Sequence, residues 1–517
     1  NLFMESNSLR FCLFVSFFIF TGEAVMNGQS SSDALRYADP RVLGTARVLG
    51  TGSAFGAVGA DQGSIGINPA GLALFRKSDL SVGLFHDNLT GEYALQGASN
   101  NSSGPLQERR TNLANLGMVF ASRPSRGNWV SSNFYIGYNN TASFQQHVEF
   151  SGVSDGSILH RFLENARDPA YQDGRGLPSD QLDEFESKLA YETGALFDIS
   201  NDSTRIFYSN DLIEHLHENI PKSGVYQQSG RQSNLSLSYA ANYREKLMIG
   251  LSLDFISANF KLDKQYSEYA SSQSLNPFID LRFSDFLATD VNGVKGNIGL
   301  IYKPFNSIRF GLSWHTPSVL RLQDKFNTSL TYRFLGQSSI EQYSSSSPDG
   351  IFDYRLIVPS RWIFSTAFIK SFGLVSIDLD YFSPNQTRFK FTDGIDLDYQ
   401  DQLNADIRKQ YKSVIQTRLG LEIPIGHLRL RAGSGFIPSP YKNDNEIRNS
   451  WSGGLGYRGH SFYLDLGYTT LPYKEALVPF STGNSDFNND GRPDAVESVV
   501  QSKLHQQHWI LTMGFRF

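Results

Sequence analysis

The chain of 517 residues carries 51 acidic and 46 basic residues, and its net charge of -5 excludes a broadly basic nucleic-acid-binding protein. Its mean hydropathy of -0.31 excludes a helical membrane protein. Charged residues make up only 19% of the chain, aromatic residues reach 13% and glycine occurs 45 times, a composition typical of short strands joined by polar turns.

The first segment, residues 1–31, is predicted to be a secretory signal peptide. Arg10 precedes the apolar stretch 11–20, and small and polar residues follow it, which is the order of regions in such peptides. We expect cleavage near residues 28–32. The single cysteine, Cys12, lies inside the apolar stretch. The exported protein is therefore expected to have no disulfide and no thiol chemistry.

The next segment, residues 32–77, is rich in glycine and alanine and shows no strand alternation. Small residues permit close packing, so this segment is predicted to be a plug, or hatch, in front of the first strand. It ends in the motif Asn68-Pro69-Ala70-Gly71. By themselves these four residues indicate a turn, because proline fixes φ while asparagine and glycine favour turn geometry.

Residues 78–517 are predicted to form a transmembrane antiparallel β-barrel of about 14 strands, an all-β fold. The final strand shows the pattern best, with one apolar face made of Trp509, Leu511, Met513, Phe515 and Phe517. The same alternation recurs in 247–255, 294–302, 375–381, 415–423, 428–431 and 462–468. A strand between lipid and lumen requires this period of two. A barrel of this width cannot fill its own lumen, which is consistent with a plug.

The joints between the strands differ greatly in length. Those at 242–245, 303–306, 424–426 and 457–460 are very short, whereas other connections are long. This asymmetry is typical of barrels with a periplasmic and an external end. The alternative is a large soluble β-sandwich or propeller, but the sequence has no repeat of blade length and ends in an apolar strand.

The connection at 151–230 is far longer than an ordinary loop and carries two stripes with helical spacing. The first follows Ser179-Asp180, a possible N-cap, and the second begins near Asp211. The stripes include Leu182, Phe185, Leu189, Leu212 and Leu216. Packing of the two stripes on each other as the core of a lid is the simpler interpretation.

The last loop, residues 473–504, contains a segment that matches the 12-residue calcium loop of EF-hands. The expected ligands are Asp486, Asn488, Asp490, Arg492 through its carbonyl, Asp494 and Glu497. Pro493 departs from the pattern, and helical flanks are not expected between two strands. We therefore predict an EF-hand-like loop that binds a structural Ca²⁺ outside the barrel. The alternative is a solvated acidic turn.

Three stretches resemble the FadL/TodX family of outer-membrane channels for long-chain fatty acids and other hydrophobic compounds. The first is the segment ending in Asn68-Pro69-Ala70-Gly71, which is similar to the family's N-terminal hatch. The others are 308–322 and 416–441. Together with the strand pattern, the resemblance covers nearly all of the chain after residue 31.

The resemblance implies passive diffusion rather than catalysis. Family members catch a hydrophobic molecule at an outer groove, pass it to a pocket in the barrel and release it sideways into the outer membrane. In this chain the residues that match the groove are Leu182, Phe185, Leu189, Leu212 and Leu216. The side opening is expected in the third strand, where Gly137, Asn139 and Asn140 interrupt an apolar face. The alternative is that this strand simply leaves the membrane there.

The resemblance places the protein in the outer membrane of a Gram-negative bacterium, as a monomer surrounded by outer-membrane lipid and serving hydrophobic small molecules. A second function remains open, because some relatives of this fold act as adaptors of a protein-secretion or surface-assembly machine. An enzyme is not predicted, since the sequence has no HExxH motif, no cysteine-based zinc site and no phosphate-binding loop.

Overall fold

The computed structural model describes residues 31–38, 44–96, 104–124, 127–171, 173–200, 205–216, 218–392, 397–482 and 498–517. The predicted signal peptide lies outside these residues except for its last position. Among the described residues, no helix is both long enough and apolar enough to cross a lipid bilayer.

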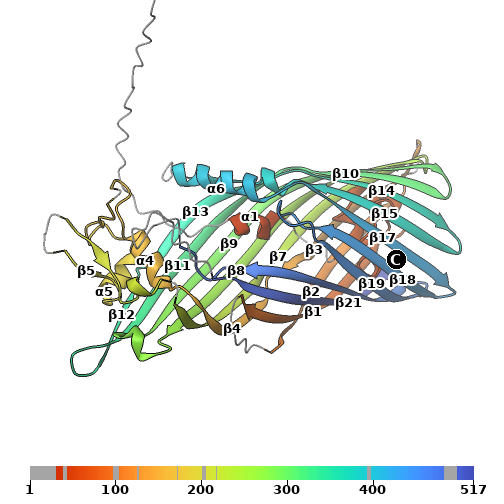
Figure 1. Ribbon diagram of the computed structural model, residues 1–517. Helices are drawn as coiled ribbons and strands as arrows, with labels where there is room; N and C mark the ends of the chain where they lie inside the picture. The colour runs from red at the N-terminus through yellow and green to blue at the C-terminus, as the bar shows by residue number, and fades with distance from the viewer. Residues whose placement is uncertain are drawn as a thin grey trace, which may run out of the picture.

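The wall of the molecule is a closed antiparallel β-barrel of 14 strands (Figure 1). Its continuous strands are β1 (Asp79–Leu95), β2 (Leu106–Ser122), β3 (Trp129–Ser143), β7 (Asn219–Tyr243), β8 (Leu247–Tyr269), β9 (Phe278–Phe305), β17 (Val414–Ile425), β18 (Leu428–Pro438), β19 (Ile447–Arg458), β20 (Phe462–Leu477) and β21 (Val500–Arg516). β1 pairs with β21 along residues 79–95 and 500–516, and this ladder closes the barrel. The predicted fold class is confirmed.

The three other wall strands each consist of two pieces, and β3 is likewise followed along β7 by a separate strand, β4 (Gln146–Asp155). The three two-piece strands are β10 (Ile308–His315) with β11 (Ser318–Leu335), β14 (Arg361–Lys370) with β13 (Gly350–Val358), and β15 (Gly373–Phe382) with β16 (Arg388–Phe391). β9 shows the continuity of the first pair, because its two halves pair with β10 and β11 in turn.

Short turns gather at one end of the barrel, on the right of Figure 1. β7 and β8 are joined through Arg244 and Glu245, whose φ angles of 54° and 58° fit the tight hairpin turns that follow the strand twist. Gly426, with a φ of 58°, makes the corresponding turn between β17 and β18. In bacterial barrels the end with short turns faces the periplasm.

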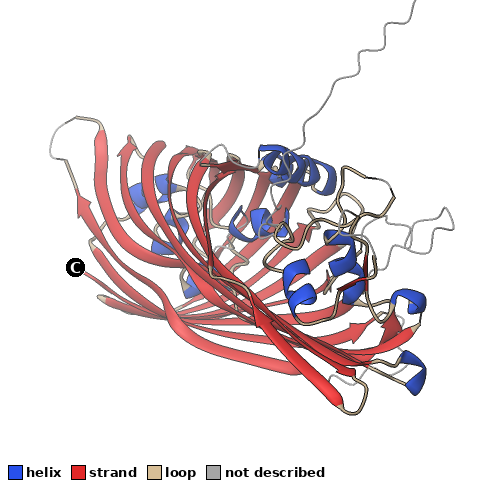
Figure 2. Ribbon diagram, turned by 90° about the vertical axis from the view of Figure 1, so that its left-hand side faces the viewer, coloured by secondary structure: helices blue, strands red, loops and turns tan. Residues whose placement is uncertain are grey.

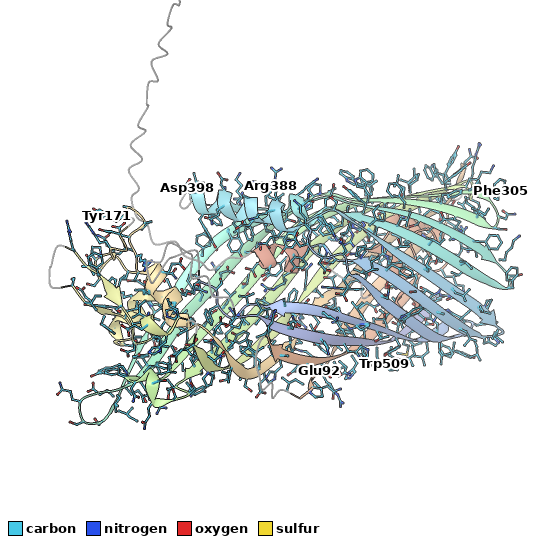
Figure 3. The ribbon with its side chains drawn as sticks, viewed as in Figure 1. Glu92, Tyr171, Phe305, Arg388, Asp398 and Trp509 are labelled. Carbon is cyan, nitrogen blue, oxygen red and sulfur yellow. The ribbon has the colours of Figure 1, made fainter. Side chains whose placement is uncertain are left out.

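The outer surface of the barrel is apolar, as the alternation predicts. The last strand exposes Trp509, Leu511, Met513 and Phe515, each by 42–48%. The predicted outward faces within 247–255, 294–302, 375–381 and 415–423 are exposed in the same way. Figure 3 shows such side chains projecting from the wall, with Phe305 near the short-turn end. A closed barrel with this surface satisfies its backbone internally and presents hydrocarbon to lipid.

The interruptions of the two-piece strands lie at one level. On the short-turn side His315, Arg361 and Phe382 occupy one row of the sheet. On the other side of the interruptions, Ser318 pairs with Val358. Ile357, which precedes Val358 in the chain, pairs with Arg388. The strand alternation in the sequence did not predict these breaks.

The polarity of the wall reverses across this line. Below it, Trp314, Trp362 and Tyr381 point outward, and the two tryptophan rings stack 5.8 Å apart. Above it, many outward positions are charged and exposed, and many inward positions are apolar and buried. The outward set includes Arg321, Arg355 and Arg388, and the inward set Leu320, Leu356 and Phe389. Arg388 is labelled in Figure 3. Because aromatic girdles mark the membrane interface, the line of breaks lies at the outer membrane surface.

The N-terminal segment occupies the lumen as the predicted plug. It contains α1 (Ser31–Ala38), α2 (Ala46–Gly50), α3 (Gln62–Ile65) and the 3₁₀ helix η1 (Pro69–Leu74). Figure 2 shows these short helices enclosed by the curve of the strands. η1 contacts β7, β8 and β9, while α2 contacts β19, β20 and β21. The plug therefore touches both sides of the lumen.

The long external connection runs from β4 (Gln146–Asp155) to β7. It contains α4 (Ile158–Asn165), α5 (Ser187–Glu192), the short strands β5 (Phe197–Asp198) and β6 (Tyr208–Ser209), and η2 (Ile213–His215). The external region is completed by elements that lie between other wall strands. These are η3 (Gln273–Leu275), β12 (Ile340–Ser346), η4 (Pro384–Gln386) and α6 (Leu397–Gln410).

The helices predicted in this connection are shorter in the structure. The first stripe yields only α5, which Gly194 follows with a φ of 76°. The second stripe yields η2 and then enters β7, where Ile220 pairs with Ser154 of β4. Strand pairing thus overrides the local helical pattern. α4 was not predicted. Its N-cap Ser157 closes a capping box with His160.

Candidate functional site: the lumen and the openings of its wall

A cavity of about 1240 Å³ lies between the plug and the external connection. At the plug it is lined by Leu49, Gly52 and Ser53, and at the external end by Phe185 and Phe283. Charged side chains also reach it, among them Arg361 and Arg418. Apolar and charged side chains thus share the lining of this cavity.

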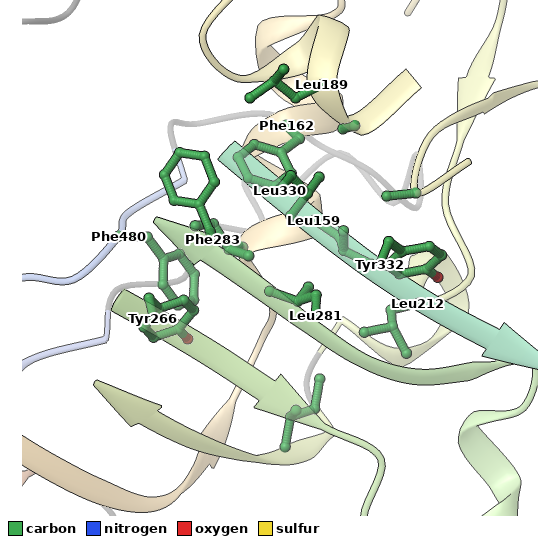
Figure 4. Packing of buried hydrophobic residues seen from close by; sticks show 14 of the residues in the cluster. Leu159, Phe162, Leu189, Leu212, Tyr266, Leu281, Phe283, Leu330, Tyr332 and Phe480 are labelled. Atoms are coloured by element: carbon green, nitrogen blue, oxygen red, sulfur yellow. The ribbon is translucent and has the colours of Figure 1, made fainter. Parts of the chain in front are cut away.

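The predicted groove residues divide into two groups. Leu182, Leu189, Leu212 and Leu216 are buried in an apolar cluster that fixes the external connection to the wall (Figure 4). Phe185 instead lines the cavity, and its ring centroid lies 4.9 Å from that of Phe326 on β11. The four leucines thus form the core of a lid, as the simpler interpretation of the sequence predicts. Of the five predicted groove residues, Phe185 is the one that faces the lumen.

The hatch motif is held by hydrogen bonds to the plug and to the wall. Asn68 caps η1 by accepting a hydrogen bond from the Ala70 N–H at 3.0 Å. Its Nδ2 donates to the carbonyl oxygens of Gly56 in the plug, at 2.7 Å, and of Leu300 on β9, at 3.2 Å. Pro69 occupies the first position of η1, where its missing N–H is no loss. Gly71 donates to the Asn68 carbonyl at 3.0 Å.

Glycines in the wall make room for this motif. A Cβ atom added to Gly250 on β8 would overlap the backbone of Pro69 and Ala70, and one added to Gly299 on β9 would lie 2.8 Å from the Ala70 nitrogen. The wall and the plug are thus in direct backbone contact. The motif signals the turn in the sequence, but the glycines that receive it lie more than 150 residues away and give no local signal.

Buried ion pairs attach α2 to the opposite part of the wall. Arg47 donates twice to Glu422 on β17, at 2.8 Å each. Glu422 also accepts from Arg431 on β18 at 2.7 Å, and Arg431 lies 2.8 Å from Asp465 on β20. All four side chains are 14% exposed or less. Bidentate Arg–carboxylate pairs of this kind fix both distance and orientation.

The third wall strand is irregular where a side opening was predicted. Its ladder with β2 ends at the Asn115–Asn139 pair, although β2 continues to Leu106 along β1. Its ladder with β7 shifts register between Asn140 and Ala142, as at a β-bulge. Gly137 pairs with Gly117 just before the ladder ends. Beyond Asn139, then, β2 and β3 share no backbone pairing in the described part of the wall.

A small cavity of about 50 Å³ lies behind this gap, and most of the residues that line it have polar side chains. Asn140 is completely buried there, and neither of its amide atoms has a protein partner in the structure. Asn139, Asp254, Lys295 and His315 also line it. A polar space of this size suits a few water molecules.

A charged belt, made of Arg361, Asp380 and Arg418, lies between the small cavity and the large one. Arg361 and Thr141 line both. Asp380 accepts from Arg361 at 2.6 Å and from Arg418 at 2.8 Å, which neutralises part of the belt. A molecule that moved from the large cavity to the β2–β3 gap would pass these groups.

Asp183, at the external end of the large cavity, has a raised pKa. Burial, and secondarily the negative charge of Glu186, raise the pKa of the Asp183 carboxyl to about 6. Glu186 itself is paired with Arg161 on α4 and accepts from Asn165 at 2.6 Å.

The end of β4 carries a short serine motif. Residues 152–156 read Gly-Val-Ser-Asp-Gly, the G-x-S-x-G form found around hydrolase nucleophiles. The structure assigns Ser154 another role. Its hydroxyl accepts from the Lys222 ammonium at 2.8 Å, and the same ammonium donates to the carbonyl oxygens of Ser154 and Asp155. Both side chains are buried away from the cavities, so the pair fastens β4 to β7.

The predicted calcium ligands at 486–497 lie outside the described residues. In the part of the chain that the structure does describe, no group of three or more histidine, cysteine or acidic side chains is placed to hold a metal ion.

Comparison with solved structures shows which fold the plug and barrel form. A FadL homologue of Pseudomonas aeruginosa aligns with 93% of this chain and all of its own length, at 12% identity and a TM-score of 0.54. The toluene transporter TodX of Pseudomonas putida aligns with 93% of this chain and 99% of its own, at 14% identity and a TM-score of 0.50. The chain has the FadL/TodX fold. No protein-family model and no curated protein matches the sequence.

The resemblance that the sequence suggested is thus confirmed at the level of the FadL/TodX fold. The likeness includes nearly the whole chain, so it covers the plug as well as the wall. A closed 14-stranded barrel with an apolar exterior belongs to the outer membrane of Gram-negative bacteria, and this architecture places the protein there.

Proposed function

We propose that the protein is a passive outer-membrane channel for hydrophobic molecules, such as long-chain fatty acids or compounds of similar character. One observation carries the proposal. A large cavity is closed toward the periplasm by a tightly seated plug and is adjoined, through a small polar cavity, by a gap in the wall between β2 and β3.

The route follows from these parts. A hydrophobic molecule enters at the external end near Phe185, occupies the large cavity and leaves sideways beyond Asn139 into the membrane. Lateral release keeps an apolar molecule out of water, where its exposure is unfavourable. The FadL and TodX relatives of the fold, one of them described as a toluene transporter, support this class of substrate.

The test is uptake by cells that lack their own transporter of this kind. Labelled oleate and a labelled aromatic hydrocarbon are supplied to cells with the wild-type protein, with the N68A/P69A variant, or with empty vector. We expect the wild type to take up at least one compound faster than the vector. The double variant should change that rate while the barrel still assembles, because its substitutions disturb the plug and not the strand ladders.

Two outcomes count against the proposal in different ways. If neither compound enters faster than with the vector, the adaptor function becomes the better one, and a protein that co-purifies with the external region would support it. If uptake occurs and the double variant equals the wild type, the channel stands but the role of Asn68 and Pro69 does not.

We also propose that the loop at 486–497 binds a structural Ca²⁺ through Asp486, Asn488, Asp490, Asp494, Glu497 and the Arg492 carbonyl. The support is the spacing of hard oxygen ligands around a glycine. The wild-type loop should resist protease in calcium and be cut in chelator, and D490A should be cut in both. Equal cleavage of the wild type in the two buffers would contradict the proposal.

A further inference from the structure

We infer that α6 is a movable section of the barrel wall that opens a second side portal, through which amphiphilic molecules enter from the headgroup level of the outer leaflet. The role of this portal rests on the proposed transport function, but the opening of α6 can be measured without a transport assay.

The first observation is that α6 stands where a strand should be. β15 pairs with β17 as far as Phe382 and Val414. Above that row β16 pairs with β13 on one edge, and in the described part of the wall no strand pairs with its other edge. α6 lies along this second edge, as its contacts with β16 show. In Figure 1 it lies at the upper margin of the barrel, beside β13.

The second observation is how α6 is attached to β16. The Asn404 amide accepts from the Phe389 N–H at 2.8 Å and donates to the Phe389 carbonyl at 3.1 Å. Gln400 accepts from the Phe391 N–H at 2.8 Å. Side chains of a helix thus replace the backbone of a missing strand. Three such bonds hold this joint, whereas an unbroken ladder joins residues 374–382 of β15 to β17 below it.

The third observation is the distribution of polarity on α6. Leu403 and Ile407 are buried against Phe389 and Phe391, in the apolar cluster that also contains residues of α1. The opposite side exposes polar residues, namely Asp398, Asp401, Arg408 and Lys409. If α6 moves outward, the tail of an amphiphile can cover the apolar surface that Leu403 and Ile407 leave.

The fourth observation is the position of the joint. Behind the C-terminal end of α6, Gln410 lines the large cavity together with Ser31 and Leu35 of α1. Gln410 accepts a hydrogen bond from the Ser31 hydroxyl at 2.7 Å. In front, the joint lies just above the outward ring of Tyr381, at the membrane surface defined by the aromatic residues. An opening there connects the cavity with the level at which amphiphiles hold their polar heads.

The opening is tested by thiol reactivity in outer membranes. Cys12 is replaced by serine, and L403C is compared with L356C, a position in the same buried cluster but on β13, between two paired strands. We expect a water-soluble maleimide to label L403C at least tenfold faster than L356C. I407C serves as a second reporter on α6, in case L403C perturbs the helix. Equal labelling of the α6 and β13 positions would overturn the inference.

The use of the portal is tested by a reversible cross-link. In N404C/F389C, or in N404C/K390C if the first variant does not fold, a short bis-methanethiosulfonate joins α6 to β16. Oleate uptake should fall at least fivefold and recover with dithiothreitol. As a matched control, S383C/S413C joins residues whose hydroxyl oxygens lie 2.9 Å apart beneath α6, which leaves the helix free.

The outcomes separate the two proposals. Undiminished uptake through the N404C/F389C cross-link, or the same loss in the control pair, would overturn the portal while leaving the channel intact. If the wild type takes up no oleate, the proposed function fails, and the thiol rates still decide whether α6 opens.

Discussion

Single glycines determine how closely the plug approaches the wall. At Gly250 and Gly299 the β-strands come within backbone contact of η1, and any side chain would push the plug away. A different glycine, Gly66, belongs to the plug but has no atom within 4 Å of the place where its Cβ would be. A comparison of the two kinds of glycine therefore separates the effect of a lost contact between plug and wall from the effect of replacing any glycine by alanine.

We predict that G250A displaces η1, whereas G66A has little effect. Overpacking at a rigid backbone contact costs about 1–3 kcal/mol. The displaced plug should admit large antibiotics that the outer membrane normally excludes, measured as growth inhibition by vancomycin, and should lower the melting temperature in detergent. Wild-type resistance and stability in G250A would show that the glycine contact does not seat the plug.

Asp183 should make the external connection sensitive to pH. Its pKa in the folded protein is about 6, above the usual value of 3.8, because burial and Glu186 disfavour the charged form. The folded state therefore binds this proton more tightly than the unfolded state. The stability linked to it is present below the unfolded pKa and is lost as the pH rises toward and through 6.

The measurement is hydrogen exchange of α5 between pH 5 and pH 7, corrected for intrinsic rates. Local opening of wild-type α5 should increase over this range, and D183N should abolish the increase. D180N, which replaces an exposed acid of the same connection, is the control. If D183N keeps the pH dependence of the wild type, another group is responsible.

Among the elements, α2 depends on a buried ion pair and the start of β1 on an exposed one. Arg47 and Glu422 are 14% and 8% exposed, while Arg76 and Glu245 are 37% and 46% exposed. Removing one partner of a buried pair leaves an uncompensated charge and costs about 3–5 kcal/mol. An exposed pair contributes about 0–1 kcal/mol.

We therefore expect R47M to lower the unfolding temperature in detergent and to loosen α2 toward protease, while R76M resembles the wild type. If R47M and R76M behave alike, the pair does not hold α2.

The elements also show what the sequence could predict. Alternation identified the strands within 247–255, 375–381 and 415–423, because lipid selects large apolar side chains on one face. It did not reveal the breaks near Pro317 and Pro359, since above them the apolar residues simply change to the inner face and the period of two continues. Helical spacing near Leu182 and Leu212 overestimated the helices, because strand pairing and a positive φ at Gly194 end them early.

The candidate site was predictable only where its signal is local. Asn68 and Pro69 form a recognisable motif, and the polar interruption at Asn139 and Asn140 marks the irregular part of β3. By contrast, the charged belt joins Asp380 to Arg361 and Arg418 across strands. The position of α6 depends on a strand edge that exists only after folding. Contacts of this kind leave no pattern in one stretch of sequence.

For the whole molecule, barrel closure predicts resistance to detergent. The β1–β21 ladder leaves no free strand edge at the point of closure, so unfolding must break a continuous ring of hydrogen bonds. The unboiled protein in dodecyl sulfate should migrate faster on a gel than the boiled protein. Identical migration, with the protein found in the soluble fraction, would contradict the barrel.

The length of the wall strands has a consequence for where the molecule collects its solute. β9 has 28 residues, and at roughly 3.3 Å per residue and a tilt of roughly 40° it reaches a height of roughly 70 Å. The apolar band of such barrels is only roughly 25 Å tall. The external mouth of the barrel therefore stands tens of ångströms above the bilayer. Collection at the mouth thus takes place among the outer surface sugars, far above the level of α6. An antibody or phage at the cell surface would meet the mouth long before it met the membrane.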